Sequence, residues 1–138
     1  MSLLLVRHAW AGHAEQWDGD DDNLRPLDDR GREQAQALVA LLEPYEVERI
    51  LSSPATRCVD TVVPLAAARG LDVETHDGLH FHRHDLDGPE LVGSLAGAPV
   101  VVCGHGGLET ALGYDVPWKK GAVLVLDGDL AILERLRA

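Results

Sequence analysis

The run Leu3-Leu4-Leu5-Val6, followed at once by Arg7 and His8, constrains the fold of this chain more than any other stretch. Four apolar residues in a row predict a short buried strand. In an open α/β sheet, ligands bind just beyond the carboxyl ends of the strands. The arginine and the imidazole would then lie at the mouth of a ligand site, although a strand can also end in polar residues for solubility alone.

Two amphipathic helices are expected in the first half of the chain. The first covers residues 28–42, and the second begins at Ser53 as the N-cap, with Pro54 in the first helical position, and ends near Gly70. Their apolar faces comprise Ala35, Leu38, Val39 and Leu42 in the first helix and Val59, Val62, Val63 and Ala66 in the second. The second helix would hold Arg57 in its first turn, at the positive end of the helix dipole.

Further strands are expected at residues 47–51, 71–74, 100–103, 122–127 and 130–136, with short helices at 90–95 and after Gly107. Residues 9–27 and 76–90 show no apolar period, and we expect both to be irregular. The order of strands and helices predicts an α/β fold of three layers, with a mostly parallel central sheet, helices on both faces and an antiparallel C-terminal edge hairpin. A single domain over residues 1–138 would accommodate these elements around one core.

Composition and charge narrow the class of protein. No apolar run is long enough to span a bilayer or to act as a signal segment, so we expect a cytoplasmic protein. Cys58 and Cys103 fall inside predicted elements and are expected to be buried thiols rather than a disulfide. The net charge of −11 argues against binding to nucleic acid or to an anionic membrane, although arginines in a cleft can still hold a small anion.

Three predicted strands end in polar residues that should meet at one edge of the sheet: Arg7-His8, Ser52-Ser53 with Arg57, and Gly104-His105. Two histidines and two arginines would converge there on a tetrahedral dianion. The chemistry that suits such a site is phosphoryl transfer to an imidazole, with His8 attacking phosphorus in line. Arg7, Arg57 and His105 would neutralise the phosphoryl oxygens, and Gly106 would let the backbone approach them closely.

These motifs resemble those of the histidine phosphatase (phosphoglycerate mutase-like) superfamily. Arg7-His8-Ala9 stands where the family has Arg-His-Gly, and the segments 52–57 and 104–106 match its second arginine and second histidine. Arg25-Pro26-Leu27 and the segment 31–35 resemble the SixA-type branch of phosphohistidine phosphatases. They also resemble the phosphatase domain attached to some Nudix hydrolases that clear oxidised guanine nucleotides.

The resemblance implies roles for individual residues. His8 would be the nucleophile, and Arg7, Arg57 and His105 would complete the phosphate pocket. Arg25, Gly106 and Lys120 are weaker candidates for substrate binding, and a salt bridge to a nearby aspartate is the alternative role for Arg25. No metal ion or other cofactor is implied.

One departure from the family pattern concerns the general acid. Phosphomonoesterases of the superfamily carry a glutamate shortly after the third strand, where this chain has Leu79-His80-Phe81-His82. Either another residue protonates the leaving group, or the substrate has a leaving group that needs no proton. If another residue protonates the leaving group, the candidates are His80, His82, Asp77 and Asp85.

Two further groups of residues leave alternatives open. His80, His82 and His84 alternate, so they could share a face and bind a metal, but a solvated polar loop is the preferred interpretation. Trp10 and Trp17 could stack on a base or ring at the mouth of the pocket, but we expect them to cover the core beneath the long loop.

We therefore expect a metal-independent phosphatase that works through a phosphohistidine on His8. Its partner would be a phosphohistidine protein or a small phosphorylated metabolite. A nucleoside diphosphate, such as an oxidised guanine nucleotide, is the alternative substrate. A phosphate-binding module with low turnover is the alternative from another class of protein, because the usual acid is missing.

Overall fold

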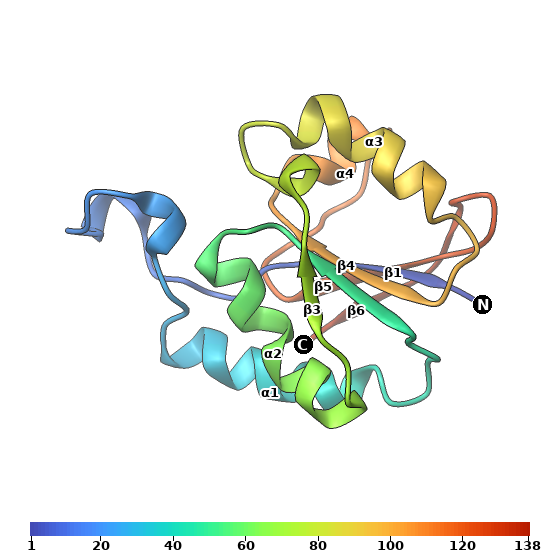
Figure 1. Ribbon diagram of the computed structural model, residues 1–138, viewed down its shortest axis with the longest axis horizontal. Coiled ribbons are helices and arrows are strands. Elements are labelled where there is room, and N and C mark those ends of the chain that lie inside the picture. The colour runs from blue at the N-terminus through green and yellow to red at the C-terminus, as the bar shows by residue number, and fades with distance from the viewer.

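The computed structural model describes all 138 residues and contains one sheet of six strands (Figure 1). The strands are β1 (Leu3–Arg7), β2 (Arg49–Ser52), β3 (Val73–Thr75), β4 (Val100–Gly104), β5 (Ala122–Leu126) and β6 (Ile132–Arg137). They lie in the order β3-β2-β4-β1-β5-β6, in which the first four are parallel and β5 is antiparallel to both β1 and β6. The predicted mixed sheet with its antiparallel C-terminal edge is therefore confirmed.

Helices cover both faces of the sheet, which confirms the three layers. α1 (Asp29–Leu41) and α2 (Thr56–Arg69) lie on one face, and α3 (His84–Ser94) and α4 (Leu108–Ala111) lie on the other (Figure 1). Three short 3-10 turns complete the chain: η1 (Ala14–Gln16), η2 (Asp22–Leu24) and η3 (Asp77–Leu79). No helix combines the length and the apolar composition that crossing a membrane would need.

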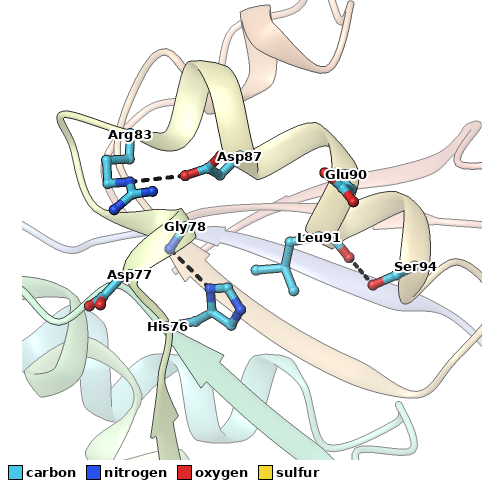
Figure 2. Close-up of a pocket in the computed structure, with 8 residues that line it drawn as sticks. All are labelled: His76, Asp77, Gly78, Arg83, Asp87, Glu90, Leu91 and Ser94. Carbon is cyan, nitrogen blue, oxygen red and sulfur yellow. Dashed lines mark hydrogen bonds and ion pairs between the residues drawn. The ribbon is translucent and has the colours of Figure 1, made fainter.

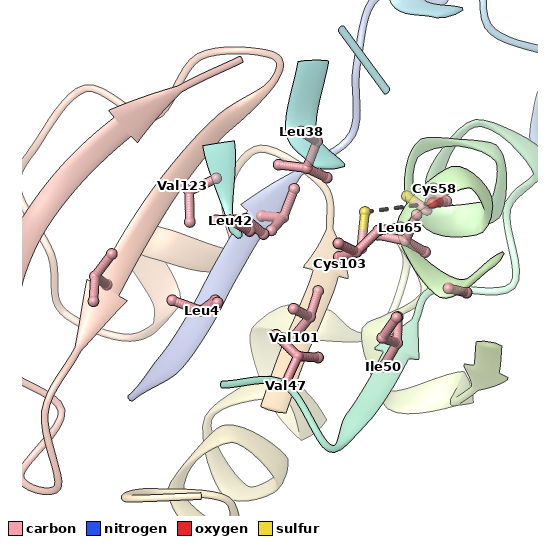
Figure 3. Packing of buried hydrophobic residues seen from close by; sticks show 14 of the residues in the cluster. Leu4, Leu38, Leu42, Val47, Ile50, Cys58, Leu65, Val101, Cys103 and Val123 are labelled. Carbon is pink, nitrogen blue, oxygen red and sulfur yellow. Dashed lines mark hydrogen bonds between the residues drawn. The ribbon is translucent and has the colours of Figure 1, made fainter. Parts of the chain in front are cut away.

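The strand β1 divides the core into two clusters, because alternate side chains of a strand point to opposite faces. Leu4 and Val6 pack with residues of α1 and α2, such as Leu38 and Leu65 (Figure 3). Leu3 and Leu5 pack in the second cluster, against the residues of α3 and α4. Burial on both faces fixes the position of β1, and with it the position of the residues that follow the strand.

Several predicted boundaries are wrong, each for a local reason. The helix α2 begins at Thr56 rather than just after Ser53, because the Ser53 backbone N–H still donates to the Cys103 carbonyl oxygen at 3.0 Å in the sheet. Val63 is 46% exposed, since Leu65 rather than Val63 continues the buried face of α2. Gly70 ends α2, as expected, and it adopts the left-handed conformation.

The segment 76–90 is not irregular throughout, because α3 begins at His84. Gly88 and Pro89 discourage a helix in the sequence, but packing overrides their low propensity. A Cβ atom at Gly88 would lie 2.6 Å from Leu108 Cδ1, so glycine allows α3 to pack closely on α4. Cys58 and Cys103 are both free and buried, as predicted.

The two tryptophans of the long loop do not cover the core, contrary to the sequence prediction. Neither Trp10 nor Trp17 belongs to a hydrophobic cluster, and only Trp118 of the three tryptophans is buried in one. The loop is mostly irregular, as expected, and η1 and η2 are its only regular turns. The loop contains too few apolar residues to form a hydrophobic cluster that would include the rings of Trp10 and Trp17.

The topology places a crevice between β1 and β4. The chain leaves β1 toward α1 on one face of the sheet and leaves β4 toward α4 on the other face. Such a switch point between neighbouring parallel strands is where open α/β sheets bind their ligands. Arg7 lies opposite Gly104 in the register, so His8 and His105 emerge side by side.

Candidate active site

A cleft of about 430 Å³ opens at the carboxyl ends of β1 and β4. Its walls come from the ends of β1 and β4, the loop after β1, the first turn of α2, the segment after β3 and the segment before β5. They comprise Arg7, His8, Gly12, His13, Ala14, Glu15, Asp22, Arg25, Arg57, Phe81, His105, Gly106 and Lys120. The structure thus brings together the four residues predicted to form the phosphate pocket, and also the three weaker candidates.

His8 is held in one orientation and one tautomer. Its backbone N–H donates to the Gly104 carbonyl oxygen at 3.0 Å, and its ring Nδ1 lies 2.8 Å from the Ala9 carbonyl oxygen. A carbonyl oxygen can only accept, so the proton sits on Nδ1 and the lone pair sits on Nε2. Burial, together with the charges of Arg57 and Arg7, lowers the pKa of His8 to about 4. The ring is therefore neutral near pH 7, as a nucleophile must be.

His105 is fixed by two side chains of the segment after β2. Nη2 of Arg57 lies 3.4 Å from His105 Nδ1, and a guanidinium can only donate, so Nδ1 accepts. Nε2–H then donates to the Ser53 hydroxyl oxygen at 2.8 Å. Burial and the charge of Arg57 lower the pKa of His105 to about 2. An anion in the cleft would reverse this effect and favour the protonated imidazolium.

Two of the three arginines of the cleft, Arg7 and Arg57, donate to carbonyl oxygens, and neither forms an ion pair shorter than 3.6 Å. Arg7 donates through Nη1 to the Trp118 carbonyl oxygen at 3.0 Å, and Arg57 donates through Nη1 to the Asp22 carbonyl oxygen at 2.8 Å. The Nε–H group of each is buried without a partner. Burial lowers the pKa of both guanidinium groups, because removing a charge from water costs free energy. An anion in the cleft would offset this cost.

Gly106 sets the position of Arg7. A Cβ atom at this residue would lie 2.8 Å from Cζ of Arg7 and 2.9 Å from its Nη2. The sequence predicted that this glycine lets the backbone approach a substrate, and the structure shows a close approach of the arginine to the same backbone. This close packing limits the movement of the Arg7 guanidinium group.

Thr61 connects the strand end to α2, and sequence reasoning did not identify it. The Ala9 backbone N–H donates to the Thr61 hydroxyl oxygen at 2.9 Å, and this hydroxyl donates to the Arg57 carbonyl oxygen at 2.7 Å. The same buried bridge therefore positions both the segment that carries His8 and the turn that carries Arg57. A threonine one helical turn after the arginine was the available signal.

The loop after β1 forms the opposite wall of the cleft. Arg25 donates through Nε to Oδ1 of Asp22 at 2.8 Å, so it forms the ion pair that was its alternative role and also lines the cleft. This hydrogen bond lowers the pKa of Asp22, which also lies 3.6 Å from Nη2 of Arg57. Glu15, on η1, is the other carboxylate of the wall, and it makes no ion pair.

Lys120 lines the cleft and packs on Trp10. Its Nζ atom lies 4.1 Å from the centre of the indole ring, and Cζ of Arg30 lies 4.3 Å from the same centre. Burial, together with the charge of Arg7, lowers the pKa of Lys120. Trp10 therefore serves as a platform for cations at the edge of the cleft.

None of the four acid candidates from the sequence lines the cleft. Asp77 borders a separate depression of about 540 Å³ between η3 and α3, where Arg83 pairs with Asp87 (Figure 2). That depression shares no lining residue with the cleft. The segment after β3 instead contributes Phe81, whose ring centre lies 5.6 Å from that of His105. An aromatic ring thus lies beside the phosphate pocket, and it cannot give a proton.

The three alternating histidines do not share a face. His80 and His82 stack on each other with ring centres 5.3 Å apart, whereas His84 is buried and lies 6.1 Å from His105. No group of three or more His, Cys, Asp or Glu side chains in the chain is placed to hold a metal ion. The metal-binding alternative for this triplet therefore has no geometric support.

Comparison with known proteins gives a family match and a relative that is similar over part of its length. A family model described as the histidine phosphatase superfamily (branch 1) matches residues 3–82, more than half of the chain. The 8-oxo-(d)GTP phosphatase of Mycolicibacterium smegmatis is 45% identical over 65 residues. These residues make up 47% of this chain but only 20% of that protein, so this chain matches about a fifth of its relative.

Solved structures share the whole fold. A protein of Agrobacterium tumefaciens that is provisionally designated phosphohistidine phosphatase SixA superposes with a TM-score of 0.78 and 26% identity, covering 99% of this chain and 97% of that one. A protein histidine phosphatase SixA complexed with tungstate gives a TM-score of 0.82 and 21% identity over 99% and 97% of the two chains.

Proposed function

The chain belongs to branch 1 of the histidine phosphatase superfamily, and we infer that it acts as a phosphatase. From this premise we propose that residues 1–138 act as one catalytic domain that hydrolyses phosphate compounds through a phosphohistidine on His8. The observation that carries the proposal is the neutral His8 ring, whose Nδ1–H is bound to the Ala9 carbonyl oxygen while Nε2 is free. Only this tautomer presents a lone pair to phosphorus.

In the first step, Nε2 of His8 attacks phosphorus and the bond from phosphorus to the leaving group breaks. Charge on the three equatorial oxygens is stabilised by Arg7, Arg57 and His105, which surround the same cleft. His105 takes up a proton as the dianion binds, because the anion opposes the effects that lower its pKa. The resulting imidazolium then donates through Nδ1 to a phosphoryl oxygen.

In the second step, water attacks phosphorus and releases inorganic phosphate from His8. A carboxylate near the cleft can accept the proton of this water. Asp22 is engaged by Arg25, with which it shares a hydrogen bond that lowers its pKa. Glu15 makes no ion pair, and we assign it the role of the base. Sequence reasoning did not identify Glu15, because the loop that carries it has no periodic pattern.

The substrate class follows from the wall around the phosphate pocket. Phe81 lies beside His105, and none of the acid candidates from the sequence lines the cleft. The substrates should therefore have leaving groups that need no proton from an acid. An imidazole that leaves from phosphohistidine and a phosphate that leaves from a diphosphate both meet this condition, whereas an alkoxide does not.

A phosphohistidine protein is the first candidate substrate, and the 26% identity over the full fold to the protein designated SixA supports it. A nucleoside diphosphate is the second candidate. The 45% identity over 65 residues to the 8-oxo-(d)GTP phosphatase favours this alternative. Both substrates would be cleaved by the same residues, without a metal ion.

The test is to trap the intermediate. Wild-type protein mixed briefly with labelled p-nitrophenyl phosphate should acquire a label that is stable in alkali and labile in acid, as a phosphoramidate is. His8→Ala should abolish the label and lower kcat by more than about 10³-fold, because removal of a nucleophile has effects of this size or larger. His82→Ala serves as a control, since this histidine is exposed outside the cleft.

The fold of His8→Ala must be checked by circular dichroism. A folded variant that keeps substantial activity, or a label that is lost in alkali as an acyl phosphate would be, contradicts the assignment of His8. Binding of phosphate by wild-type protein without measurable turnover of any substrate would indicate the binding module instead.

A further inference from the structure

A groove of about 330 Å³ adjoins the catalytic cleft on the side of the long loop. It is lined by Ala11, Gly12, His13, Gln16, Trp17, Arg25, Pro26, Leu27 and Asp28. Three of these residues, Gly12, His13 and Arg25, also line the cleft. A molecule that holds a phosphoryl group at His8 could therefore extend directly into the groove.

The most conspicuous residue of the groove is Trp17. Its ring is only partly buried and belongs to none of the hydrophobic clusters of the molecule. A large aromatic ring that is exposed on a polar loop exposes apolar surface to water without stabilising a core. Such a ring is accessible to a ligand that can stack on it.

The ring of Trp17 is held in place on one side only. A Cβ atom at Gly19 would lie 2.3 Å from Cζ2 of Trp17 and 2.4 Å from its Cε2, so the Gly19 backbone covers one face of the ring. The indole N–H donates to the Asp21 carbonyl oxygen at 3.1 Å. The polar edge and one face are thus satisfied within the loop, and the ring is oriented before any ligand arrives.

Gly12 lies at the junction of the two cavities. Its φ is +64°, and a Cβ atom there would meet nothing within 4 Å. The space in front of Gly12, where the cleft and the groove meet, is therefore open. Arg25 lies on the same boundary and carries a positive charge next to it.

From these observations we infer that the groove binds the base of a nucleoside diphosphate, with the base stacked on Trp17. The inference rests on the proposed function, which supplies the phosphoryl site at His8. The terminal phosphate lies in the cleft, the inner phosphate passes Arg25, and the ribose crosses the open junction at Gly12. The groove is large enough for a base and is separate from the phosphate cleft, as a ligand of this length requires.

The reaction in this pose follows the two steps given above. Nε2 of His8 bonds to the terminal phosphorus, and the bond from this phosphorus to the bridging oxygen breaks. The bridging oxygen leaves as an oxygen of the nucleoside monophosphate. Water then attacks phosphorus and loses its proton to Glu15, which regenerates His8 and releases inorganic phosphate.

The experiment compares ADP and GDP with pyrophosphate, which has the same bond but no base. Stacking of a base on an aromatic side chain is worth about 10-fold to 100-fold in binding. Wild-type protein should therefore prefer ADP and GDP to pyrophosphate in kcat/KM. Trp17→Ala should lower this preference by about 10-fold or more, mainly through KM, whereas Trp17→Phe should retain most of it. Leu24→Ala, which changes an exposed apolar residue of the same loop, should preserve the preference.

Trp17→Leu gives a second test in case the alanine variant does not fold, because leucine keeps apolar bulk against Gly19 but has no flat ring. It should also lose the preference. An equal loss of activity toward ADP and pyrophosphate in the Trp17 variants would overturn the inference, because it would indicate a purely structural role. Turnover of p-nitrophenyl phosphate without turnover of ADP or GDP would overturn the inference and leave the proposed function intact. Failure with all these substrates would remove both.

Discussion

The two walls of the catalytic cleft are built in opposite ways. The wall formed by the strand ends and the first turn of α2 holds His8, Arg57 and His105, which are 6%, 4% and 1% exposed. His8 and His105 are bound to the buried residues Ala9 and Ser53, whereas Arg57 donates to the Asp22 carbonyl oxygen in the loop wall. The wall formed by the loop after β1 holds Glu15 and Arg25 on short 3-10 turns and irregular chain. The strand wall contributes the nucleophile and the phosphate pocket, and the loop wall contributes the proposed base and the surface that the rest of the substrate meets.

The difference has a physical origin. A buried imidazole or guanidinium needs a fixed environment, because a poorly paired polar group in the interior is costly. The hydrogen bonds from Thr61 and Ser53 provide this environment for the strand wall. The loop wall contacts water, so a small shift of its residues costs little. We therefore expect substitutions in the strand wall to have larger effects than substitutions in the loop wall.

The largest effect among the variants that retain all four phosphate-pocket residues is expected at Gly106. Gly106→Ala places a Cβ atom 2.8 Å from Cζ of Arg7, so the guanidinium must move. Because a displacement of about 1 Å can cost about 10²-fold, kcat/KM for p-nitrophenyl phosphate should fall by about this factor. The backbone at Gly106 does not have a positive φ, so the clash with Arg7 alone accounts for the loss.

The matched control is Gly93→Ala on the surface of α3, where a Cβ atom meets nothing within 4 Å. This variant should keep wild-type activity and should be at least as stable, because alanine favours a helix more than glycine does. Equal activity of the Gly106 and Gly93 variants would show that the strand wall tolerates displacement of Arg7, and the contrast between the walls would be lost.

The loop wall should give a smaller effect that is confined to one step. Glu15→Gln removes the proposed base of the second step, so hydrolysis of the phosphoenzyme should slow by about 10-fold to 100-fold, the low end of general-base effects. Release of p-nitrophenol should then show a burst followed by a slow steady rate. Rapid-quench measurement of labelled protein should show the phosphoenzyme accumulating.

The control for this variant is Glu33→Gln, which removes an exposed carboxylate on α1 outside the cleft. It should show no burst. A Glu15→Gln variant that slows the formation of the phosphoenzyme, and not its hydrolysis, would make this residue an acid in the first step. In that case alkyl phosphates would become suitable substrates, and the argument for activated leaving groups would fail.

The contrast between the two walls also explains which site residues could be predicted from the sequence. The strand wall was predicted residue by residue, because buried apolar runs locate the strands and parallel strands bring their carboxyl ends together. This topology predicted the positions of Arg7, His8 and His105, and the expected start of the helix after Ser53 added Arg57. The positioning by Ser53 and Thr61 was not predicted, because the His105 ring and the Ala9 backbone that their hydroxyl groups bind lie far away in the sequence.

The loop wall could not be predicted in the same way. Glu15 and Trp17 lie in a segment without an apolar period, and their positions depend on contacts such as the one between Trp17 and Gly19. The acid candidates fail to line the cleft for a related reason. The segment after β3 was expected to be irregular up to residue 90, whereas α3 turns the chain away and leaves Phe81 beside His105.

The smallest predicted effect is on the pH dependence of the free energy of unfolding, which should change with a substitution in the strand wall but not with one in the loop. The pKa of His8 is about 4 and that of His105 about 2 in the folded protein, whereas an unfolded histidine titrates near about 6.5. Between about pH 6.5 and 4 the unfolded chain therefore binds more protons, and the free energy of unfolding falls as the pH falls. The slope that each such histidine contributes rises toward about 1.4 kcal/mol per pH unit as the pH falls below about 6.5. Urea unfolding at intervals from pH 7 to pH 5 should show this slope reduced in His8→Asn and unchanged in Leu24→Ala.

Because tungstate would favour the protonated form of His105, its addition should also flatten the slope in wild-type protein. Equal slopes in wild type and His8→Asn would mean that the strand wall does not hold His8 neutral.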